Sequence, residues 1–464
     1  MRVLHAIHDF LPRHRAGSEL YCLELCLALQ RLGTATHVLC ADYDPRRPHG
    51  ELVWRAFEGV GVTELINNWA FAGFAESYAS PAIERRLSAV LDMLQPDLLH
   101  VHNLLNLSFA LPAMARRRGI PVVATLHDYT LVCPSGGQRV HVAEEHVCRV
   151  IESSRCARCF PQHPLYAQLR FGTRALRAPG SRLLGGWASA IRRRLPRLAA
   201  GFGRWAVRAD SPLSSAAIEA RLAAARRVFD TIDLFVAPSQ ALAEEYRRLG
   251  IPSERLRVAD YGFAPLASRR GDDRARPRRQ AGDPLRVGFV GTLVWHKGAH
   301  LLLAAAATLP PASFEVVLFG DPDVFPDYTS RLRRAAAALP VRFAGPFDHR
   351  DTADVYSQID VLVVPSLWPE NSPLVIHEAF QAGVPVIGAR IGGIPELVQD
   401  GVSGLLYDAF SPAALAAALR RLLDEPGLRE RLAAGVPPVK SIDEDAAEWQ
   451  RVYAGLIGGR SSAS

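Results

Sequence analysis

Residues 359–380 have the sequence IDVLVVPSLWPENSPLVIHEAF, which places a short apolar run, a proline-containing loop and a helix-forming stretch one after another. The apolar run predicts a strand that is buried on both faces of a parallel sheet. Pro373 fits the first turn of a helix but would disrupt a helix interior. We therefore expect Glu370 to lie in the loop and Glu378 to lie about one turn inside the helix that follows.

The same alternation of apolar strand-like runs and helix-like stretches extends through both halves of the chain. In the first half, the expected strands lie at 2–8, 36–41, 97–102, 121–127, 233–239 and 255–260. In the second half, they lie at 285–291, 314–320, 341–345, 359–366, 384–389 and 403–407. Apolar strands separated by helices predict an α/β fold with two parallel sheets, each covered by helices on both faces.

The length of the chain favours two domains. Its 464 residues are about three times the common domain size, and residues 264–284 are charged and contain Pro and Gly, as linkers do. The expected divisions are an N-terminal domain at 1–265, a linker at 266–284, a C-terminal domain at 285–440, and a C-terminal helix and tail at 441–464. Within the N-terminal domain we expect a cysteine-rich loop at about 130–160 and an arginine-rich helical insertion at about 161–230. The C-terminal helix is expected to pack back toward this domain.

The bulk composition indicates which classes of partner and which cellular compartment to expect. A net charge of +7 and a pI near 9.2 favour anionic partners such as nucleotides, phospholipid headgroups or acidic glycans. The first apolar run is too short for a secretory signal, and no window offers about 20 uninterrupted apolar residues. Seven cysteines, an odd number, are typical of a reducing compartment. We therefore expect a cytoplasmic protein.

Three motifs of the second half occur in a fixed order. They are GTLVWHKG at 291–298, the stretch at 359–380, and AGVPVIGARIGGIPELVQDGVSGLLY at 382–407. Together they resemble the family 4 retaining glycosyltransferases, or glycosyl transferases group 1. The first half resembles that family more loosely, at 8–29, 97–102, 124–129 and 233–239. The resemblance implies the GT-B architecture, in which two Rossmann-like doubly wound domains face a central cleft. The N-terminal domain would be the acceptor side, and the C-terminal domain would bind the nucleotide sugar.

The resemblance assigns the diphosphate of the donor to the glycine-bracketed loop of the first motif. Gly291, Thr292 and Lys297 are the expected contacts, and Lys297 would supply a positive charge beside backbone N–H groups. A departing nucleoside diphosphate needs such fixed donors to meet its growing charge. The family usually has an arginine at the position of Thr292. A second cation is therefore either missing or supplied from elsewhere, for example by Arg13 or Arg15.

The second motif would hold the two sugars of the donor. By the resemblance, Glu378 accepts hydrogen bonds from the ribose hydroxyls, and Glu370 holds hydroxyls of the transferred sugar. Backbone N–H groups near the sugar and the phosphates are expected from Asn371, Ser372 and Leu374. Because ribose and transferred sugar lie at opposite ends of a diphosphate, one carboxylate in the loop and one on the helix would suit such a donor.

Two histidines follow neighbouring strands of the first half and would face the cleft. The family has a histidine at the position of His127 that contacts the transferred sugar, so His127 joins Glu370 and Lys297 in the expected catalytic set. Asp128 is expected to orient His127 or to bind the acceptor. His102, at the end of the adjacent strand, is expected on the acceptor side.

Two short motifs have competing explanations. In the family, the glycine loop at the position of Gly17 approaches the donor phosphates and the acceptor, whereas the alternative is an ordinary helix entry capped by Ser18. The sequence DPD at 321–323 matches a metal-binding signature of the other large glycosyltransferase fold. It follows a strand, however, and predicts a turn. We expect no catalytic metal.

Four cysteines lie in one stretch of 27 residues: Cys133, Cys148, Cys156 and Cys159. The last two have the Cys-x2-Cys spacing of zinc knuckles, so the group predicts a structural tetrahedral zinc site. An iron–sulfur cluster and unligated thiols are the alternatives. The other three cysteines stand among apolar residues and are expected in the core: Cys22, Cys26 and Cys40.

The segment 153–209 contains no acidic residue, and ten arginines between 170 and 208 alternate with large apolar side chains. Such a segment can lie on an anionic membrane. The alternative is a helical insertion that packs on its own domain and presents a solvated arginine face.

Taken together, the motifs predict a retaining hexosyltransferase of polysaccharide biosynthesis. It would move a sugar from a UDP- or GDP-linked donor to a glycan or lipid-linked acceptor, in the cytoplasm or peripherally on the inner membrane face. The alternatives are a nucleotide-sugar epimerase of the same fold and a non-catalytic nucleotide- or nucleic-acid-binding protein. Nucleic acid is not expected, because the arginines are not interleaved with an RNA-binding sheet motif.

Overall fold

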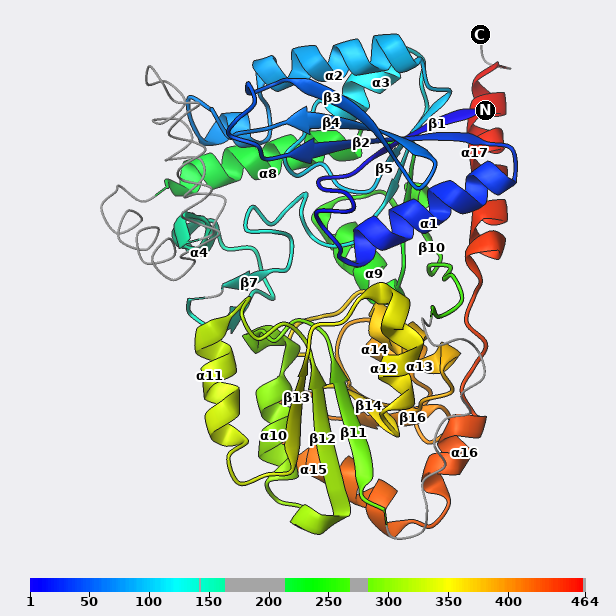
Figure 1. The fold of residues 1–464 in the computed structure, drawn as a ribbon. Coiled ribbons are helices and arrows are strands. Elements are labelled where there is room, and N and C mark those ends of the chain that lie inside the picture. Colours follow the sequence, from blue (N-terminus) through cyan, green and yellow to red (C-terminus); the bar gives the residue numbers. More distant parts are fainter. Residues whose placement is uncertain (142, 163–212, 268–282, 462–464) are drawn as a thin grey trace. The chain divides into compact units, whose positions relative to one another are not determined.

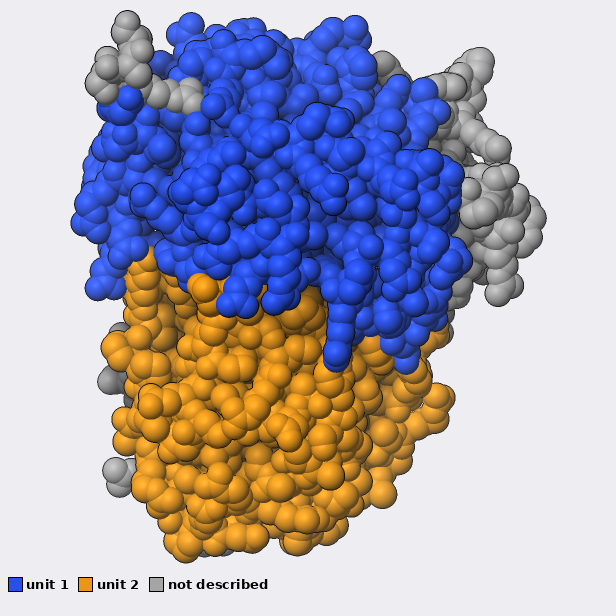
Figure 2. Space-filling model, turned by 180° about the vertical axis from the view of Figure 1, so that it is seen from behind, with its two compact units in different colours: residues 1–238, 243–259, 442–464 blue, residues 239–242, 260–441 orange. Residues whose placement is uncertain are grey.

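The computed structural model describes residues 1–141, 143–162, 213–267 and 283–461. Contacts divide the chain into two compact units, which Figure 2 colours separately. Unit 1 contains Met1–Pro238, Ala243–Ala259 and Ile442–Ser464, and unit 2 contains Ser239–Leu242 and Asp260–Ser441. The ten arginines of the predicted membrane segment lie outside the described residues.

Unit 1 is built on an eight-stranded sheet with the order β10-β9-β6-β5-β1-β2-β4-β3 (Figure 1). All neighbours pair in parallel except β3 and β4. The strands are β1 (Arg2–Ala6), β2 (Ala35–Asp42), β3 (Leu52–Phe57), β4 (Val60–Ile66), β5 (Leu98–Val101), β6 (Val122–Thr125), β9 (Leu234–Ala237) and β10 (Leu256–Val258).

Helices connect these strands, as in doubly wound folds. They are α1 (Gly17–Arg31), α2 (Pro81–Leu94), α3 (Leu111–Arg117), α4 (Ser153–Cys159), α8 (Ser215–Phe229), α9 (Gln240–Leu249) and α17 (Ile442–Ser461), with short 3-10 turns η1 (Phe74–Ser77), η2 (Phe160–Gln162) and η3 (Ser253–Arg255). Helix α17 comes from the far end of the chain and packs against α1 (Figure 1). Tyr21 of α1 donates a hydrogen bond to Asp445 at 2.7 Å and accepts one from Trp449 at 3.0 Å.

Two antiparallel hairpins of unit 1 were not predicted from the sequence. One joins β3 to β4 through Glu58 and Gly59, whose φ angles of 48° and 86° suit a tight hairpin turn. Its edge strand β3 is only partly buried, so it lacks the continuous apolar run that marks the other strands. The second hairpin pairs β7 (Val140–His141) with β8 (His146–Val147).

Unit 2 is built on a six-stranded, fully parallel sheet with the order β13-β12-β11-β14-β15-β16. Its strands are β11 (Leu285–Val290), β12 (Phe314–Phe319), β13 (Val341–Gly345), β14 (Val361–Val364), β15 (Val386–Ala389) and β16 (Gly404–Tyr407). Its helices are α10 (Ala299–Ala306), α11 (Pro326–Ala335), α12 (Thr352–Ser357), α13 (Leu374–Gln381), α14 (Ile394–Leu397), α15 (Pro412–Asp424) and α16 (Leu428–Ala434), with η4 (Trp295–Lys297), η5 (Pro311–Ser313) and η6 (His349–Asp351). The twelve predicted strands are thus confirmed.

The side chains of β14 show why its sequence is apolar throughout. Val361 and Val363 belong to the core cluster that contains α10 and α15, whereas Leu362 and Val364 belong to the cluster that contains α12 and α13. The strand is therefore buried on both faces, as expected for a parallel sheet covered on both sides. In unit 1, the cysteines predicted to be core residues are indeed in a buried apolar cluster: Cys22, Cys26 and Cys40.

Candidate active site

The two central strands of unit 2 form a topological switch point. β11 and β14 pair in parallel, but the chain continues from β11 to β12 on one side and from β14 to β15 on the other. Ligands of doubly wound sheets bind where the loops that leave such strands diverge. Here these loops begin at Gly291 and at Pro365, in the first two motifs of the second half.

Lys297 and Glu370 come from these two loops and form an ion pair. Nζ of Lys297 lies 2.7 Å from Oε1 of Glu370 and 5.2 Å from the ring centroid of Trp368. The Ser366 hydroxyl donates a hydrogen bond to the same carboxylate oxygen at 2.5 Å. Glu370 is only 5% exposed. The switch point therefore has a fixed buried anion beside a partly exposed cation.

Glu378 lies inside α13, and Pro373 is the N-cap residue of that helix, so the predicted positions of Glu370 and Glu378 are confirmed. Tyr356 donates a hydrogen bond from its hydroxyl to Oε2 of Glu378 at 2.8 Å. Burial, and then the negative charge of Glu378, raises the pKa of Tyr356 well above its usual value. The phenol therefore keeps its proton and fixes the orientation of the carboxylate.

The chain between the two carboxylates is held by side chains that sequence analysis did not identify. Asn371 and Ser372 are buried, and Leu374 begins α13. Oγ of Ser372 lies 2.7 Å from Oδ1 of Asp260 and 2.8 Å from Nε2 of His377. These contacts hold the segment in place and thereby fix the positions of its backbone N–H groups.

Gly392 and Gly393, between β15 and α14, pack directly against the backbone of the same loop. The N–H group of Gly393 donates to the carbonyl of Glu370 at 2.7 Å. A Cβ atom at Gly393 would lie 1.8 Å from the carbonyl oxygen of Asn371, and one at Gly392 would lie 2.3 Å from that of Glu370. Sequence analysis gave these glycines no role. The paired glycines in the third motif were the signal for this close backbone approach.

The glycines of the first motif bring its loop close to β14. Gly291 has φ = 145°, and Gly298 has φ = 78°. A Cβ atom at Gly298 would lie 1.9 Å from the carbonyl oxygen of Pro365, so only glycine fits there. Thr292 is exposed at the start of the loop. The close approach at Gly298 places Lys297 beside the loop that carries Glu370.

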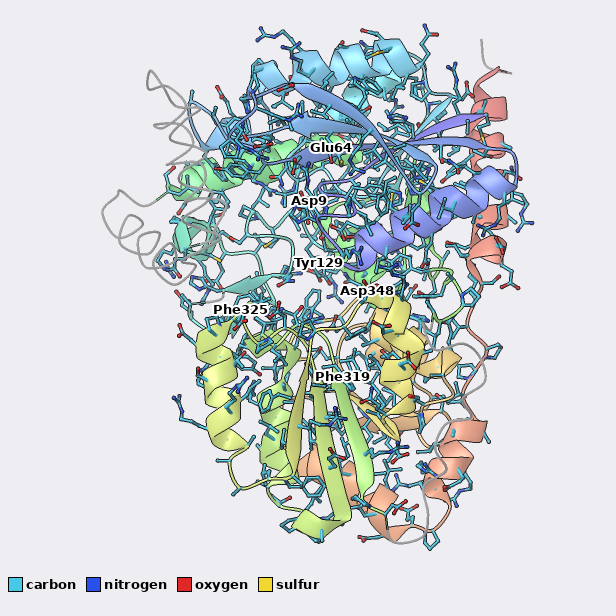
Figure 3. All side chains as sticks on the ribbon, viewed as in Figure 1. Asp9, Glu64, Tyr129, Phe319, Phe325 and Asp348 are labelled. Carbon is cyan, nitrogen blue, oxygen red and sulfur yellow. The ribbon has the colours of Figure 1, made fainter. Side chains whose placement is uncertain are left out.

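Arg13, one of the two arginines suggested as a second cation, is already paired inside unit 1. Its guanidinium forms an ion pair with Asp42 and lies 3.9 Å from Glu64, which Figure 3 labels. Glu64 also accepts a hydrogen bond from Arg55 at 2.7 Å. Arg13 would therefore have to leave two carboxylates to reach a diphosphate.

Three predicted residues of the first half line one pocket of unit 1. The pocket is small and is lined by His102, His127 and Asp128 at the carboxyl ends of β5 and β6, which are adjacent in the sheet. Further polar lining comes from Asn103, Thr125, Thr130 and Tyr246. Among the described residues, the lining contains no lysine or arginine. The pocket thus offers hydrogen-bonding groups, and the buried guanidinium of Arg221 donates to the backbone carbonyls of two lining residues, Thr130 and Leu131.

Asp128 is anchored by its neighbours in this pocket. Its carboxylate accepts hydrogen bonds from the hydroxyl and the N–H group of Thr130, and Nδ2 of Asn103 lies 3.3 Å from it. Burial raises the pKa of Asp128 above its usual value. The ring of His127 is instead held by His102, whose Nδ1 lies 3.0 Å from its Nε2.

His102 belongs to a row of imidazoles that continues into the core. Its Nε2 lies 3.1 Å from Nδ1 of His5, and its ring stacks on His100 with a centroid distance of 4.2 Å. Burial lowers the pKa of His100 and His102 well below the usual value, and burial followed by the charge of His8 lowers the pKa of His127 to about 3. A neutral imidazole has one donor and one acceptor nitrogen, so the hydrogen bonds of the row all run in one direction.

Gly17 is the first residue of α1, and the entry to this helix differs from the predicted alternative. The N-cap residue is Ala16, so capping by Ser18 is wrong. The Glu19 carboxylate accepts hydrogen bonds from the Ala16 N–H group and the Ser18 hydroxyl, each at 3.1 Å. The Glu19 carboxylate therefore fixes the start of α1, and with it the positions of the N–H groups in the first turn.

The four cysteines of the predicted zinc site gather in one lobe of unit 1, formed by the β7–β8 hairpin, α4 and the loop before them. Burial, and then the neighbouring cysteines, raises the pKa of Cys156 to about 12. In the part of the chain that the structure describes, the groups of His, Cys, Asp and Glu with ligand atoms within 4.8 Å of one another do not include these four. A zinc site here requires the sulfur atoms to move closer together, and it stays a prediction.

Two further expectations concern the DPD sequence and membrane-spanning helices. The N–H group of Asp323 donates to the side chain of Asp321 at 2.8 Å, so the DPD sequence forms a turn, as predicted. Among the described helices, none has the length and the apolar character that crossing a bilayer requires.

Comparisons with known proteins agree with this arrangement. Residues 16–262 match the model of the glycosyl transferase 4-like domain, and residues 272–436 match that of glycosyl transferases group 1. A D-inositol 3-phosphate glycosyltransferase from Corynebacterium glutamicum is 33% identical over 258 residues, which are 53% of this chain and 58% of that protein. The chain thus matches little more than half the length of this relative.

Solved structures resemble this chain over its whole length. Sucrose-phosphate synthase from Thermosynechococcus elongatus has a TM-score of 0.64 at 19% identity over 99% of both chains. Anabaena HepE in complex with UDP-glucose has a TM-score of 0.60 at 19% identity over 100% of both chains. These similarities show the GT-B fold. Because the 4-like domain model alone covers more than half of the 464 residues, the chain belongs to the group 1, 4-like family of glycosyltransferases.

Proposed function

We propose that the protein is a retaining glycosyltransferase that moves a hexose from a nucleoside diphosphate to a hydroxyl group of an uncharged glycan. The observation that carries this proposal is the ion pair of Lys297 and Glu370 at the switch point of unit 2. In this proposal, its cation meets the diphosphate and its carboxylate meets the sugar hydroxyls. Family membership supports the same reaction class.

In the proposed complex, the two members of the ion pair bind different parts of the donor. When a diphosphate enters, the ammonium group of Lys297 interacts with its oxygens, and the carboxylate of Glu370 remains held by the Ser366 hydroxyl. Glu370 then accepts hydrogen bonds from hydroxyls of the transferred sugar. Glu378, oriented by Tyr356, accepts those of the ribose. Each carboxylate has a partner that holds it in place.

The reaction needs no nucleophile from the protein. The acceptor oxygen forms a bond to the anomeric carbon, and the bond from that carbon to the diphosphate oxygen breaks. The nucleoside diphosphate leaves with the electron pair, and the proton of the acceptor hydroxyl passes to the departing phosphate on the same face. Lys297 stabilises the negative charge that develops on the leaving group, and such electrostatic stabilisation is usually the main way in which a protein accelerates a reaction of this kind.

The pocket of unit 1 supports an uncharged acceptor. His127 and Asp128 offer hydrogen-bonding groups, and the lining within the described residues has no lysine or arginine. The buried cation beside this pocket, Arg221, already donates to the backbone carbonyls of Thr130 and Leu131, so a phosphorylated acceptor would have to compete with them for it. The acceptor therefore differs in class from the D-inositol 3-phosphate in the name of the first relatives. UDP is the proposed donor nucleotide, since HepE was solved with UDP-glucose.

The proposal is tested by donor binding and product analysis. UDP-hexoses should raise the melting temperature of the purified protein more than GDP- or ADP-hexoses do. With a panel of acceptors, UDP release should occur with neutral oligosaccharides and not with inositol phosphates. NMR of the new bond should show the anomeric configuration of the donor.

The possible outcomes separate the alternatives. Conversion of the sugar nucleotide to an epimer without any acceptor would replace the proposal by an epimerase. Stabilisation by nucleotide sugars without turnover of any acceptor would favour a binding protein. Transfer to an inositol phosphate alone would overturn the acceptor class while leaving the transferase intact.

A further inference from the structure

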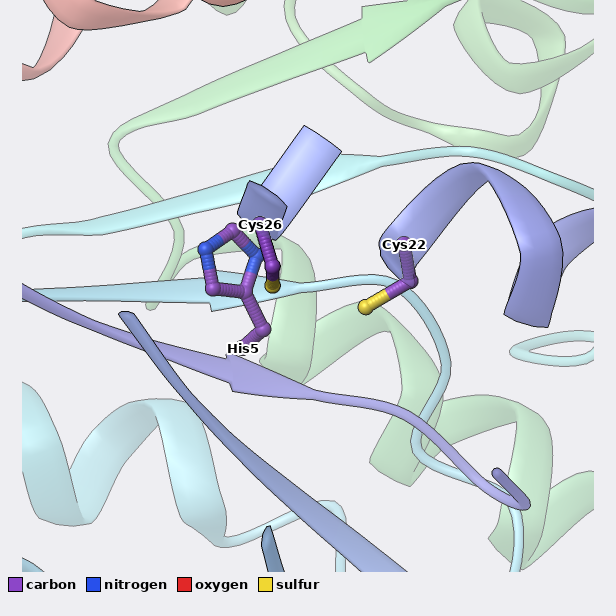
Figure 4. Close-up of side chains that lie close together, drawn as sticks. All are labelled: His5, Cys22 and Cys26. Atoms are coloured by element: carbon purple, nitrogen blue, oxygen red, sulfur yellow. The ribbon is translucent and has the colours of Figure 1, made fainter. Parts of the chain in front are cut away.

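A second group of ligating side chains lies inside unit 1, outside the cysteine lobe. His5 on β1 and Cys22 and Cys26 on α1 offer three ligand atoms, all within 4.8 Å of one another (Figure 4). All three residues have 0% exposure. Nothing in the proposed transfer reaction uses them.

The local structure explains why these side chains meet. Cys22 and Cys26 are four residues apart on α1, so their side chains lie on one face of the helix, one turn apart. This face packs on the sheet, in the same buried cluster as Val38 and Cys40. His5 projects from β1 toward that helix (Figure 4). Two thiols and one imidazole thus converge in the core.

The hydrogen bonds decide which nitrogen of His5 is available. Nδ1 of His5 is 3.1 Å from Nε2 of His102. Nε2 of His5 is buried and makes no hydrogen bond of normal geometry with the described residues, and the side chain of α1 that interacts with this ring is the Cys26 thiol, a member of the same group. A buried polar atom in this position costs free energy unless it finds a partner. A ligand at Nε2 would supply one.

A competing group, His5 with His100 and His102, is also within 4.8 Å. Both ring nitrogens of His100 are occupied, by Tyr453 at 2.7 Å and Thr125 at 2.8 Å. Both nitrogens of His102 are occupied as well, by His5 and His127. A metal ion in that group would have to displace these hydrogen bonds. In the group with the two thiols, the interactions that a metal ion would replace are those that Cys26 makes with Cys22 and His5.

We propose that Cys22, Cys26 and Nε2 of His5 form an internal site for one thiophilic metal cation, Zn²⁺ or Cu⁺. Thiolate and imidazole are the ligands these ions prefer, and a group without carboxylates does not suit Mg²⁺ or Ca²⁺. Zinc–sulfur and zinc–nitrogen bonds of about 2.3 and 2.0 Å put ligand atoms of one site roughly 3.4–3.8 Å apart, so only a small contraction is needed. Binding releases the thiol protons to solvent.

The two ions differ in how they match the site. Two thiolates and a neutral imidazole balance the charge of Zn²⁺, which avoids a net charge in the core. Cu⁺ leaves one negative charge but accepts three ligands, whereas Zn²⁺ usually takes four. The shared chemistry is a soft cation held by two sulfur atoms and one nitrogen.

Metal binding at this site would fix the tautomers of the histidines that lead to the candidate acceptor pocket. A neutral His5 that ligates through Nε2 carries its proton on Nδ1 and donates it to His102. His102 must then donate from Nδ1 to Nε2 of His127. His127 in turn carries its proton on Nδ1. The His102 contact is the outer-shell partner that metal-ligating histidines commonly have.

The first experiment measures metal content in the full-length protein. After incubation with Zn²⁺ or with Cu⁺ under reducing conditions and removal of excess metal, Cys22→Ala and Cys26→Ala should each hold about one ion per chain less than the wild type. Cys40→Ala is the matched control, because Cys40 is a buried thiol of the same cluster outside the ligand group. It should hold as much metal as the wild type. Whichever ion shows the difference identifies the metal.

The second experiment needs no variant. The ¹¹³Cd NMR spectrum of Cd²⁺-loaded wild-type protein distinguishes a site with two sulfur ligands and one nitrogen from a site with four sulfur ligands. A resonance of the first type is expected, whatever the cysteine lobe binds. The proposal is overturned if only a four-sulfur resonance or none appears, or if folded Cys22→Ala and Cys26→Ala retain the metal content of the wild type.

Discussion

At the scale of single residues, the central feature is that Lys297 and Glu370 hold each other before any donor binds. Glu370 is buried and would be costly to leave without a partner, so the ammonium group and the Ser366 hydroxyl stabilise its charge. Trp368, 5.2 Å from the ammonium group, restricts Lys297 from another side. In the proposed reaction the cation is thus positioned in advance of the diphosphate, which would lower the cost of organising the site.

Replacing Lys297 by methionine should lower kcat/KM by about 30- to 1,000-fold, equivalent to about 2–4 kcal/mol of transition-state stabilisation. Methionine keeps most of the side-chain volume but removes the charge. Lys297→Arg should lose less, because the charge remains although the geometry of the guanidinium differs. Steady-state kinetics with the preferred nucleotide sugar, and circular dichroism to verify the fold, provide the measurement. Equal kinetics for a folded Lys297→Met and the wild type would exclude Lys297 from the diphosphate site.

At the scale of elements, three loops at the carboxyl ends of β11, β14 and β15 meet backbone to backbone. Gly298 touches the loop after β14, and Gly392 and Gly393 touch the same loop from the side of β15. In these places a single methyl group has no room. The position of Glu370 thus depends on neighbouring strands as much as on its own loop.

Gly393→Ala should displace the loop that carries Glu370, because the new Cβ would lie 1.8 Å from the carbonyl oxygen of Asn371. We expect kcat/KM to fall by about 100-fold, the effect of a displacement of roughly 1 Å at a reacting centre. The free energy of unfolding should fall by about 1–3 kcal/mol, as for other overpacked sites. Kinetics and urea unfolding measure the two effects.

Gly455→Ala is the matched control for this substitution. Gly455 lies in α17, and a Cβ atom added there meets nothing within 4 Å. Alanine should leave kcat/KM unchanged and raise the free energy of unfolding by up to about 1 kcal/mol, because glycine is unfavourable in a helix. If both variants behave alike, the close contact of Gly393 has no functional consequence.

The cysteine lobe leads to a prediction of its own. Cys156→Ser should lower the zinc content of the purified protein by about one ion per chain and reduce its melting temperature. It should not change the stabilisation by nucleotide sugars, because these cysteines belong to unit 1 and the proposed donor site to unit 2. Elemental analysis and thermal unfolding measure these effects. Unchanged zinc content in a folded variant would favour unligated thiols.

The elements could be predicted from sequence because local patterns define them. Apolar runs marked the strands, and Pro373 marked the start of α13. The edge strand β3 escaped detection since it is only partly buried and has no such run. The partners that lie far from the site residues in the chain could not be predicted. Ser372 meets Asp260, which is 112 positions away, and nothing local in either segment indicates that contact.

At the scale of the whole molecule, a group of buried neutral histidines makes stability depend on pH. Burial lowers the pKa of His100 and His102, and burial with the charge of His8 lowers that of His127 to about 3. Below the usual histidine pKa of about 6.5, the unfolded chain takes up protons that the folded chain does not. Stability is therefore lost as the pH falls from about 6.5 toward 3.

The free energy of unfolding should be lower at pH 5 than at pH 7, and His127 alone should account for about 2 kcal/mol of the difference. His127→Asn should reduce the difference by that amount. His14→Asn, which removes an exposed histidine of the same unit, should leave it unchanged. Urea unfolding at the two pH values is the measurement. A difference that His127→Asn does not reduce would mean that this imidazole is protonated in the folded state.

The packing of α17 in unit 1 has a consequence for synthesis on the ribosome. The helix buries Trp449 and Tyr453 against α1 and β5, yet it is made only after residues 260–441 of unit 2. At about 5–20 residues per second, these residues take roughly 10–35 s to translate. During that time the nascent unit 1 displays the apolar surface that α17 later covers, whereas unit 2 is complete before α17 emerges. In a permuted gene that encodes α17 before β1, the nascent unit 1 should therefore complete its folding before unit 2 is synthesised.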